Sequence, residues 1–365
     1  MKRPCTVLMT GAGAPGAYGI IQCLRFNGER DIRIVGVDMN PAAGCRDMVD
    51  VFRTVPPASD ARFPEEILRI SREEAVDVVL PIVTRELMPL AKAKPAFVEK
   101  GIAVCVMDPE PLALANDKAA LLSFCRDQGL PTPEFRVADT ADEVERALDE
   151  MGCDRRALYV KAAQGNGSRG VRYVDPLVSR FDRFFNEKPD SAFMSKEDIM
   201  LALRERDAIP RMLVMEALPG VEYSADIVAD EEGNIRCSAV RKSPVVRSSI
   251  TLESTVVDEP SVASLCAQIV GRAKLTGNVG FDFRADAQGI PRLLEVNPRL
   301  TATVVLNAAA GANFPYFGVK QALGEDIPAV SLRYGVSVHR RYEERYTDER
   351  GKALVPFPPK WKDRA

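Results

Sequence analysis

The sequence predicts two parts of different class: an N-terminal doubly wound parallel α/β sheet, then an α+β region rich in antiparallel strands. In the first third, short apolar strands alternate with helical segments, which is typical of a parallel sheet. From residue 212 onward strand follows strand, with turn residues such as 230–234 between them. We therefore expect four segments, at residues 1–111, 112–215, 216–345 and a tail at 346–365.

The composition excludes several classes of protein. Of 365 residues, 46% are hydrophobic and 28% are charged, and the net charge of -3 carries no basic footprint for nucleic acid. No apolar run reaches the roughly 18–20 residues that span a bilayer, and the N-terminus does not resemble a signal peptide. The eight cysteines form no Cys-x-x-Cys pair, so we expect reduced thiols in a cytoplasmic protein with no structural zinc, no nucleic-acid partner and no membrane partner.

The single histidine, His339, excludes a His-based catalytic triad and a His-rich zinc site. Proton chemistry in this chain must then depend on carboxylates, lysines or the substrate. With no carboxylate beside it in sequence, His339 itself is expected to be structural or on the surface.

A glycine motif in the first third is typical of dinucleotide-binding proteins. Gly11-Ala-Gly13-Ala-Pro-Gly16 lies between a strand and a helix, and Asp38 ends the next strand. This pattern supports one hypothesis, an NAD(P)-dependent oxidoreductase. Pro15 removes a backbone N–H from the loop, which favours the alternative that the turn only closes the first strand–helix unit.

Hairpin geometry predicts a metal site near residue 290. If the turn is centred between Gln288 and Gly289, Asp282 lies opposite Glu295, with Cβ atoms about 4.5–5.5 Å apart. Asn297 is two residues beyond Glu295 and shares its face. Two facing carboxylates repel, and a divalent cation such as Mg²⁺ or Mn²⁺ would reverse that. The alternatives are a solvated polar face or another register.

Other polar segments point to a nucleotide. Lys161 precedes a glycine-rich loop at 162–170, whose N–H groups can approach phosphates closely, although a flexible hairpin is the alternative. Glu222 begins an alternating strand and is placed to accept ribose hydroxyls, or to belong to a polar outer face. A basic cluster beyond these strands is suited to a carboxylate or phosphate, or is merely surface charge; it comprises Arg241, Lys242 and Arg247.

Together these pieces resemble the ATP-grasp superfamily, and in particular ligases similar to one synthetase half of carbamoyl phosphate synthase, over roughly residues 5–345. The resemblance implies an ATP-grasp fold with two subdomains and the nucleotide between them. The residues it assigns to ATP are Lys118, Lys161, Gln164, Gly165, Gly167, Ser168, Gly170, the hinge residues Glu216, Ala217 and Leu218, and the ribose acid Glu222. It assigns Asp282, Glu295 and Asn297 to magnesium, and Arg299 to phosphate contact.

The implied chemistry is phosphoryl transfer from ATP to a carboxylate, followed by attack of an amine on the acylphosphate. Lys161 and Arg299 would take the main catalytic roles, with Arg241 and Arg247 as weaker candidates. Such a reaction needs ATP, Mg²⁺ or Mn²⁺, and two small-molecule substrates, but no imidazole. A homodimer is expected only from the family. A non-catalytic nucleotide-binding protein is the further alternative.

Overall fold

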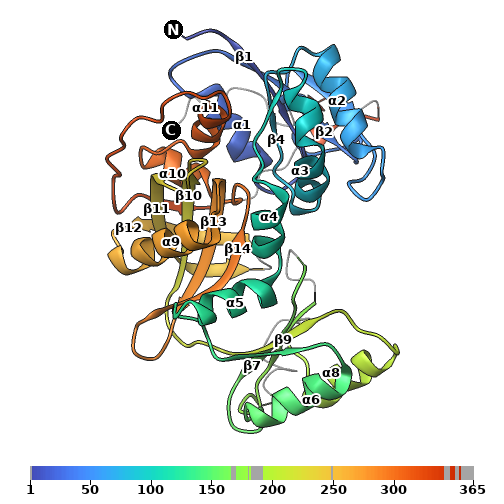
Figure 1. Ribbon diagram of the computed structural model, residues 1–365, viewed down its shortest axis with the longest axis vertical. Coiled ribbons are helices and arrows are strands. Elements are labelled where there is room, and N and C mark those ends of the chain that lie inside the picture. Colours follow the sequence, from blue (N-terminus) through green and yellow to red (C-terminus); the bar gives the residue numbers. More distant parts are fainter. Residues whose placement is uncertain are drawn as a thin grey trace.

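The structure is a computed structural model that describes residues 2–165, 170–179, 181, 192–247, 250–340, 346–349 and 353–354. In this part of the chain the strands form a five-stranded, a four-stranded, a six-stranded and a two-stranded sheet. Figure 1 shows the five-stranded sheet beside the six-stranded one, with the four-stranded sheet below them. The fold is therefore a parallel α/β unit followed by antiparallel sheets, as the sequence predicts.

The N-terminal sheet has the strand order β3-β2-β1-β4-β5, and all its neighbours are parallel. Its strands are β1 (Cys5–Met9), β2 (Ile32–Asp38), β3 (Val51–Thr54), β4 (Val78–Leu80) and β5 (Ala103–Val104). Its helices are α1 (Ala17–Arg25), α2 (Phe63–Glu73) and α3 (Thr84–Val98), with a 3₁₀ turn η1 at Arg46–Met48. The strand order reverses between β1 and β4, so a crevice opens at their carboxyl ends.

Two helices lead out of this sheet, α4 (Pro109–Asn116) and α5 (Lys118–Asp127). From the sequence, with Pro109 and Pro111 as punctuation, one helix is expected over 112–128; that expectation is wrong, because the helix is broken at Asp117. Asp117 adopts an extended conformation, and its side chain caps α5 by accepting a hydrogen bond from the backbone N–H of Ala120. The break places Lys118 at the first position of α5, next to the six-stranded sheet.

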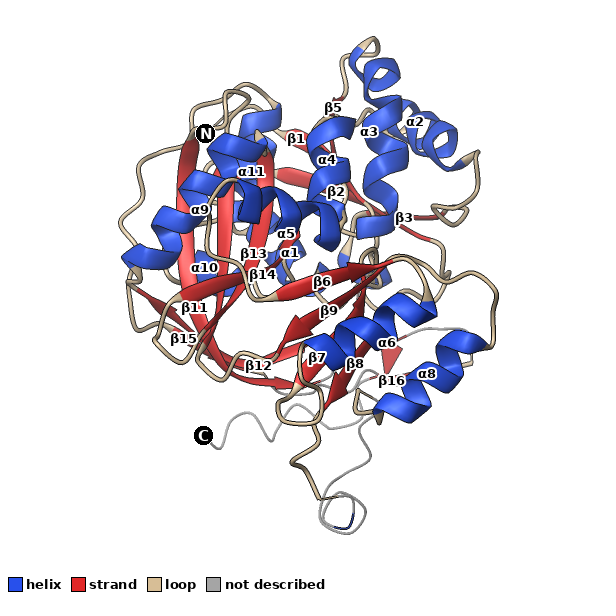
Figure 2. Cartoon of the chain, turned by 60° about the horizontal axis from the view of Figure 1, so that its bottom comes forward, coloured by secondary structure: helices blue, strands red, loops and turns tan. Residues whose placement is uncertain are grey.

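The four-stranded sheet has the order β6-β9-β7-β8, and helices α6 and α8 lie together on one of its faces (Figure 2). Its elements are β6 (Phe135–Ala138), α6 (Ala141–Glu150), β7 (Leu158–Ala162), β8 (Val171–Val174), α8 (Lys196–Arg204) and β9 (Met212–Glu216). The side chains of Thr140 and Glu143 cap the start of α6. Thr140 Oγ1 accepts a hydrogen bond from the backbone N–H of Glu143, and the Glu143 carboxylate accepts one from the backbone N–H of Asp139. The expected helical segment at 176–209 falls partly outside the described residues, and α8 is its described helix.

The six-stranded sheet has the order β14-β13-β10-β11-β12-β15 and is antiparallel throughout. Its strands are β10 (Glu222–Ala229), β11 (Ile235–Arg247), β12 (Ile250–Val257), β13 (Gly277–Ala285), β14 (Pro291–Asn297) and β15 (Ser337–His339). Helices α9 (Pro260–Ala273) and α11 (Phe314–Ala322) pack on it, and α10 (Val305–Ala309) contacts β12. A short β16–β17 pair, Tyr346–Thr347 with Ala353–Leu354, follows.

The N-terminal unit is fixed against the six-stranded sheet by packing and by charge. Gly16 and Gly19 lie so close to Ala302 and Val305 that an added Cβ would come within 2.9 Å of each. On α11, Lys320 pairs with Glu29 at 3.0 Å. The N-terminal unit therefore forms a wall of any cavity at this junction.

The cysteines behave as expected. All eight lie in the described part of the chain, none forms a disulfide, and all but Cys105 are buried. None of the helices that the structure describes combines the length and the apolar run that crossing a bilayer requires. His339 is exposed on the edge strand β15, with Nδ1 at 3.9 Å from a carboxylate oxygen of Glu253, as fits a surface position.

Candidate functional site

A cavity of about 520 Å³ lies where the three large sheets meet. From the N-terminal unit it is lined by Thr84 and Arg85. The remaining lining residues come from α4, α5, the loop after β7 and the strand β14: Ala115, Asn116, Lys118, Ala162, Gln164, Gly165, Gly170, Glu295, Val296 and Asn297. Six of the twelve lining residues are ones that the sequence assigns to ATP or metal.

The β13–β14 hairpin brings the predicted metal ligands together. Asp282 pairs with Glu295, as the hairpin geometry predicts. Near the turn the register differs by one residue, with Phe283 opposite Leu293, and a β-bulge between Asp282 and Phe283 corrects it. The predicted pair is right, and the predicted turn centre is wrong by half a residue.

The three side chains form one polar cluster on the sheet. The Asn297 amide Nδ2 donates to Asp282 Oδ2 at 3.2 Å and to Glu295 Oε1 at 3.4 Å. Ser224 Oγ donates to the other Asp282 oxygen at 2.8 Å. Burial, and then the negative charge of Glu295, raise the pKa of Asp282 to about 7.

This cluster fits a divalent cation. Two carboxylates and an amide are hard oxygen donors of the kind that Mg²⁺ prefers. A cation between the carboxylates would remove the repulsion that raises the pKa of Asp282. A half-turn of the Asn297 amide exchanges its nitrogen for its oxygen in nearly the same volume. All three residues can then present oxygen to a cation, and Asn297 gives up the hydrogen bond that its Oδ1 accepts from Arg299.

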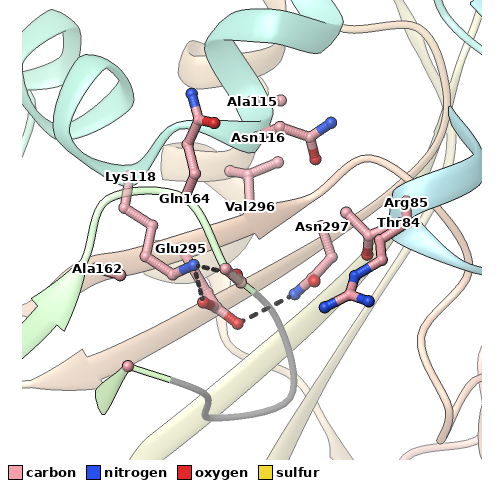
Figure 3. Close-up of a pocket in the computed structure, with 12 residues that line it drawn as sticks. Thr84, Arg85, Ala115, Asn116, Lys118, Ala162, Gln164, Glu295, Val296 and Asn297 are labelled. Atoms are coloured by element: carbon pink, nitrogen blue, oxygen red, sulfur yellow. Dashed lines mark hydrogen bonds and ion pairs between the residues drawn. The ribbon is translucent and has the colours of Figure 1, made fainter. Parts of the chain in front are cut away.

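Lys118 spans the cavity beside this cluster. Its ammonium lies 3.2 Å from Glu295 Oε2 and donates to the Gly165 carbonyl at 2.9 Å (Figure 3). Gln164 donates to Asp117, the capping residue of α5, at 3.1 Å. These two hydrogen bonds, one donated by Lys118 and one by Gln164, connect the loop after β7 to the start of α5. Gly167 and Ser168 lie outside the described residues.

Lys161 and Glu222 form a second charged group next to the cavity. Burial lowers the pKa of Lys161 to about 8, and the carboxylates of Glu295 and Glu222 oppose that shift. Burial raises the pKa of Glu222, while the positive charges of Arg284, Lys161 and Arg241 act against it. Neither residue is among those lining the cavity, but their charges act on each other and on Glu295.

The predicted hinge residues connect β9 to β10. Backbone N–H groups of Glu216 and Ala217 donate to the carbonyls of Glu134 and Ala157, at 3.0 and 3.2 Å. In the described part of the chain, the N–H of the buried Leu218 has no such partner. Of the three hinge N–H groups, that of Leu218 is the one available to donate a hydrogen bond to a nucleotide base.

Arg241 is not a surface charge. Only 2% of its side chain is exposed, and it pairs with the buried Asp226 at 3.2 Å. Asp226 also accepts hydrogen bonds from Thr301 and Asn307, each at 2.7 Å. The polar face of β10 is therefore internal beyond Glu222, which corrects the outer-face alternative, and contact of Arg241 with a substrate stays a prediction. The Arg247 side chain lies outside the described part of the structure.

Arg299 connects the polar cluster on β13 and β14 to the N-terminal unit. Its Nε donates to Thr84 Oγ1 at 2.8 Å and its Nη2 to Asn297 Oδ1 at 3.3 Å. Sequence reasoning missed Thr84 and its neighbour Arg85. Both follow β4, next to the point where the strand order reverses, and ligands of open α/β sheets bind at such points. That rule, applied to the predicted strands, would have found them.

The glycine motif satisfies its own polar groups. The backbone N–H of Gly13 donates to Asp38 Oδ2 at 2.7 Å, and Asp38 Oδ1 accepts from the N–H of Asn40 at 2.8 Å. Gly16 is in contact with Ala302. The loop N–H and the carboxylate that a dinucleotide would need are bonded to each other. The geometry favours the structural interpretation of this motif.

Comparisons with known proteins agree with this architecture. Residues 208–343 match the family described as ATP-grasp in the biosynthetic pathway with Ter operon, and residues 7–105 match the PylC-like N-terminal domain. The chain therefore has an ATP-grasp fold, with an ATP-grasp family match over residues 208–343, and it is similar to one synthetase half of the carbamoyl phosphate synthase large chain.

Individual relatives are distant. An uncharacterized protein (y4rH) of Sinorhizobium fredii is 30% identical over 53% of this chain and 38% of its own length. The carbamoyl phosphate synthase large chain of Deinococcus radiodurans is 24% identical over 80% of this chain and 27% of its own. The chain thus spans well under half the length of these relatives. The biotin carboxylase domain of 2-oxoglutarate carboxylase from Hydrogenobacter thermophilus, solved with MgADP, ADP and bicarbonate, aligns with a TM-score of 0.67 at 16% identity, covering 97% of this chain and 83% of that one.

Proposed function

We propose that the chain is an ATP- and Mg²⁺-dependent ligase that couples a carboxylate to an amine. The observation that carries the proposal is that Glu295 and Asn297, which form one cluster with Asp282, line a cavity together with Lys118 and the glycine-rich loop after β7. Several relatives and structural neighbours are named as ligases or synthetases, among them a D-alanine–D-alanine ligase and an L-amino acid ligase.

In the proposed reaction, a carboxylate oxygen attacks the γ-phosphorus of ATP, and the bond from that phosphorus to ADP breaks. The acylphosphate that forms is attacked at carbon by a neutral amine, which loses a proton as phosphate leaves. Asp282, Glu295 and Asn297 would hold Mg²⁺, which would supply positive charge to offset the negative charge of the phosphates.

The chain's own groups bind and orient the reactants. Lys118 and Lys161 supply positive charge to the phosphates, and Gly165 and Gly170 allow their close approach. Arg299, held by Thr84 and the Leu300 carbonyl, supplies a fixed guanidinium. Catalysis then consists of positioning and charge neutralisation. The division of the chain at residues 111, 215 and 345, and a homodimer, stay predictions.

A screen for ADP and phosphate release over pairs of carboxylic acids and amines tests the proposal. We expect release only when both substrates and Mg²⁺ are present, and none from the Glu295→Gln variant. Binding of ATP without ADP formation across the whole panel would instead indicate a non-catalytic nucleotide-binding protein.

A further inference from the structure

The cavity has two chemically different ends, which lie on either side of Glu295 and Asn297 (Figure 3). At one end are Lys118, Gln164 and the glycine-rich loop after β7. At the other end are Thr84 and Arg85, from the first turn of α3 in the N-terminal unit. The proposed function uses the first end for phosphates and leaves the second end unassigned.

Arg85 differs from the other arginines near the site in having no partner among the residues that the structure describes. Arg299 is bonded to Thr84, Asn297 and the Leu300 carbonyl, and Arg241 is paired with Asp226. Within the described residues, Arg85 makes no hydrogen bond and no ion pair, and its side chain points toward Asn297 (Figure 3). A guanidinium in this position offers a planar pair of donors that matches a carboxylate.

The topology gives an independent reason to place a ligand here. Arg85 lies in the segment that follows β4, beside the reversal of strand order between β1 and β4. Side chains at the carboxyl ends of strands at such a reversal are where open α/β sheets bind small molecules. The glycine loop after β1, whose polar groups are internally bonded, leaves this role to the segment after β4.

We propose that Arg85 binds the carboxylate substrate and holds its reacting oxygen toward the phosphates beside Glu295 and Asn297. The inference rests on the proposed function and extends it, because it assigns the acid to the wall built by the N-terminal unit. The acid is recognised by a two-pronged contact with the guanidinium, and the nucleotide does not depend on that contact. A substitution of Arg85 should therefore weaken binding of the acid without weakening binding of the nucleotide.

Isothermal titration on the full chain tests this separation. The probes are Mg·ADP alone, and then acetate, succinate and the twenty standard amino acids added to the Mg·ADP complex. In Arg85→Gln we expect the best-binding carboxylate to lose about tenfold or more in affinity, since a charge-assisted contact is removed. The Kd of Mg·ADP stays within about twofold, because its contacts are untouched, and Arg85→Lys keeps part of the carboxylate affinity.

The matched control is Lys92→Gln, which removes an exposed positive charge from the same helix, two turns farther along. It should change neither affinity. Equal carboxylate affinity in wild type and Arg85→Gln, or no carboxylate binding to the wild-type complex, would overturn the inference. An equal loss of Mg·ADP affinity would also overturn it, by assigning Arg85 to the nucleotide. Failure of wild type to bind Mg·ADP at all would instead count against the proposed function.

Discussion

The glycine loop after β1 and the β13–β14 hairpin carry equally suggestive sequence patterns, but their polar groups have different fates in the fold. In the loop, the Gly13 N–H and the Asp38 carboxylate bond to each other, and Gly16 packs on Ala302. In the hairpin, Glu295 and Asn297 line a cavity beside Lys118. A pattern identifies residues able to bind a ligand; whether the fold leaves them lining a cavity decides if a ligand can reach them.

The hairpin side of this comparison should be the most sensitive to change. Asp282→Asn or Glu295→Gln removes one of two carboxylates in the cluster, and we expect at least about a 100-fold loss of turnover, more than the loss typical of outer partners of metal ligands. Mn²⁺ binding followed by electron paramagnetic resonance should weaken in parallel. Glu231→Gln, an exposed change in the β10–β11 turn, is the control. Full activity in either hairpin variant would show that these residues hold no metal.

The same contrast exists along one face of strand β10. Glu222 lies near the cavity, whereas the Asp226 carboxylate is bonded to other side chains inside the protein. Asp226→Ala leaves Arg241 buried without its partner, and we expect unfolding free energy to fall by about 3–5 kcal/mol. Chemical denaturation measures this, with the exposed Asp258→Ala, expected within about 0.5 kcal/mol of wild type, as control. A loss below 1 kcal/mol would mean that the Asp226 network does not support the site.

On the loop side, Gly16→Ala should affect packing rather than ligand binding. The added Cβ would lie 2.9 Å from the Ala302 Cα, and relieving that contact should cost about 1–3 kcal/mol of unfolding free energy. Gly44→Ala, where the Cβ meets no atom within 4 Å, should be neutral or stabilising by up to about 1 kcal/mol. Equal stability of the two variants would contradict the docking role given to Gly16.

The smallest expected effect is a pH dependence of nucleotide binding. With a pKa of about 8, Lys161 is charged below that pH and neutral above it. We expect ADP affinity to fall by up to about tenfold for each pH unit above 8. Lys161→Arg should remove the dependence, because arginine stays protonated. The same slope in both proteins would exclude Lys161 as its source.

Local patterns predicted much of this architecture. The pairing of Asp282 with Glu295 followed from the hairpin, and the parallel N-terminal sheet followed from alternating strands and helices. What sequence reasoning missed depended on distant contacts. The extended conformation of Asp117 splits a continuous helical pattern, because its side chain caps α5 and accepts from Gln164. The bulge beside Asp282 likewise has no signature in the residue order.

The residues of the N-terminal wall were missed for another reason. Thr84 meets Arg299 across 215 positions of sequence, and no local pattern reports such a contact. The alternation of β10 allows a polar outer face as one alternative, because alternation does not distinguish solvent from a buried polar network. Only the docking of the N-terminal unit and the loop after β14 makes that face internal.

The central claim is that the cavity beside the β13–β14 hairpin, and not the Gly11–Gly16 loop after β1, binds the nucleotide. The most direct test is the shift in thermal unfolding temperature of wild type with ATP and Mg²⁺, compared with the shift produced by NAD. We predict stabilisation by ATP with Mg²⁺, its loss in Glu295→Gln, and no stabilisation by NAD. Stabilisation by NAD, with none from ATP and Mg²⁺, would contradict the account.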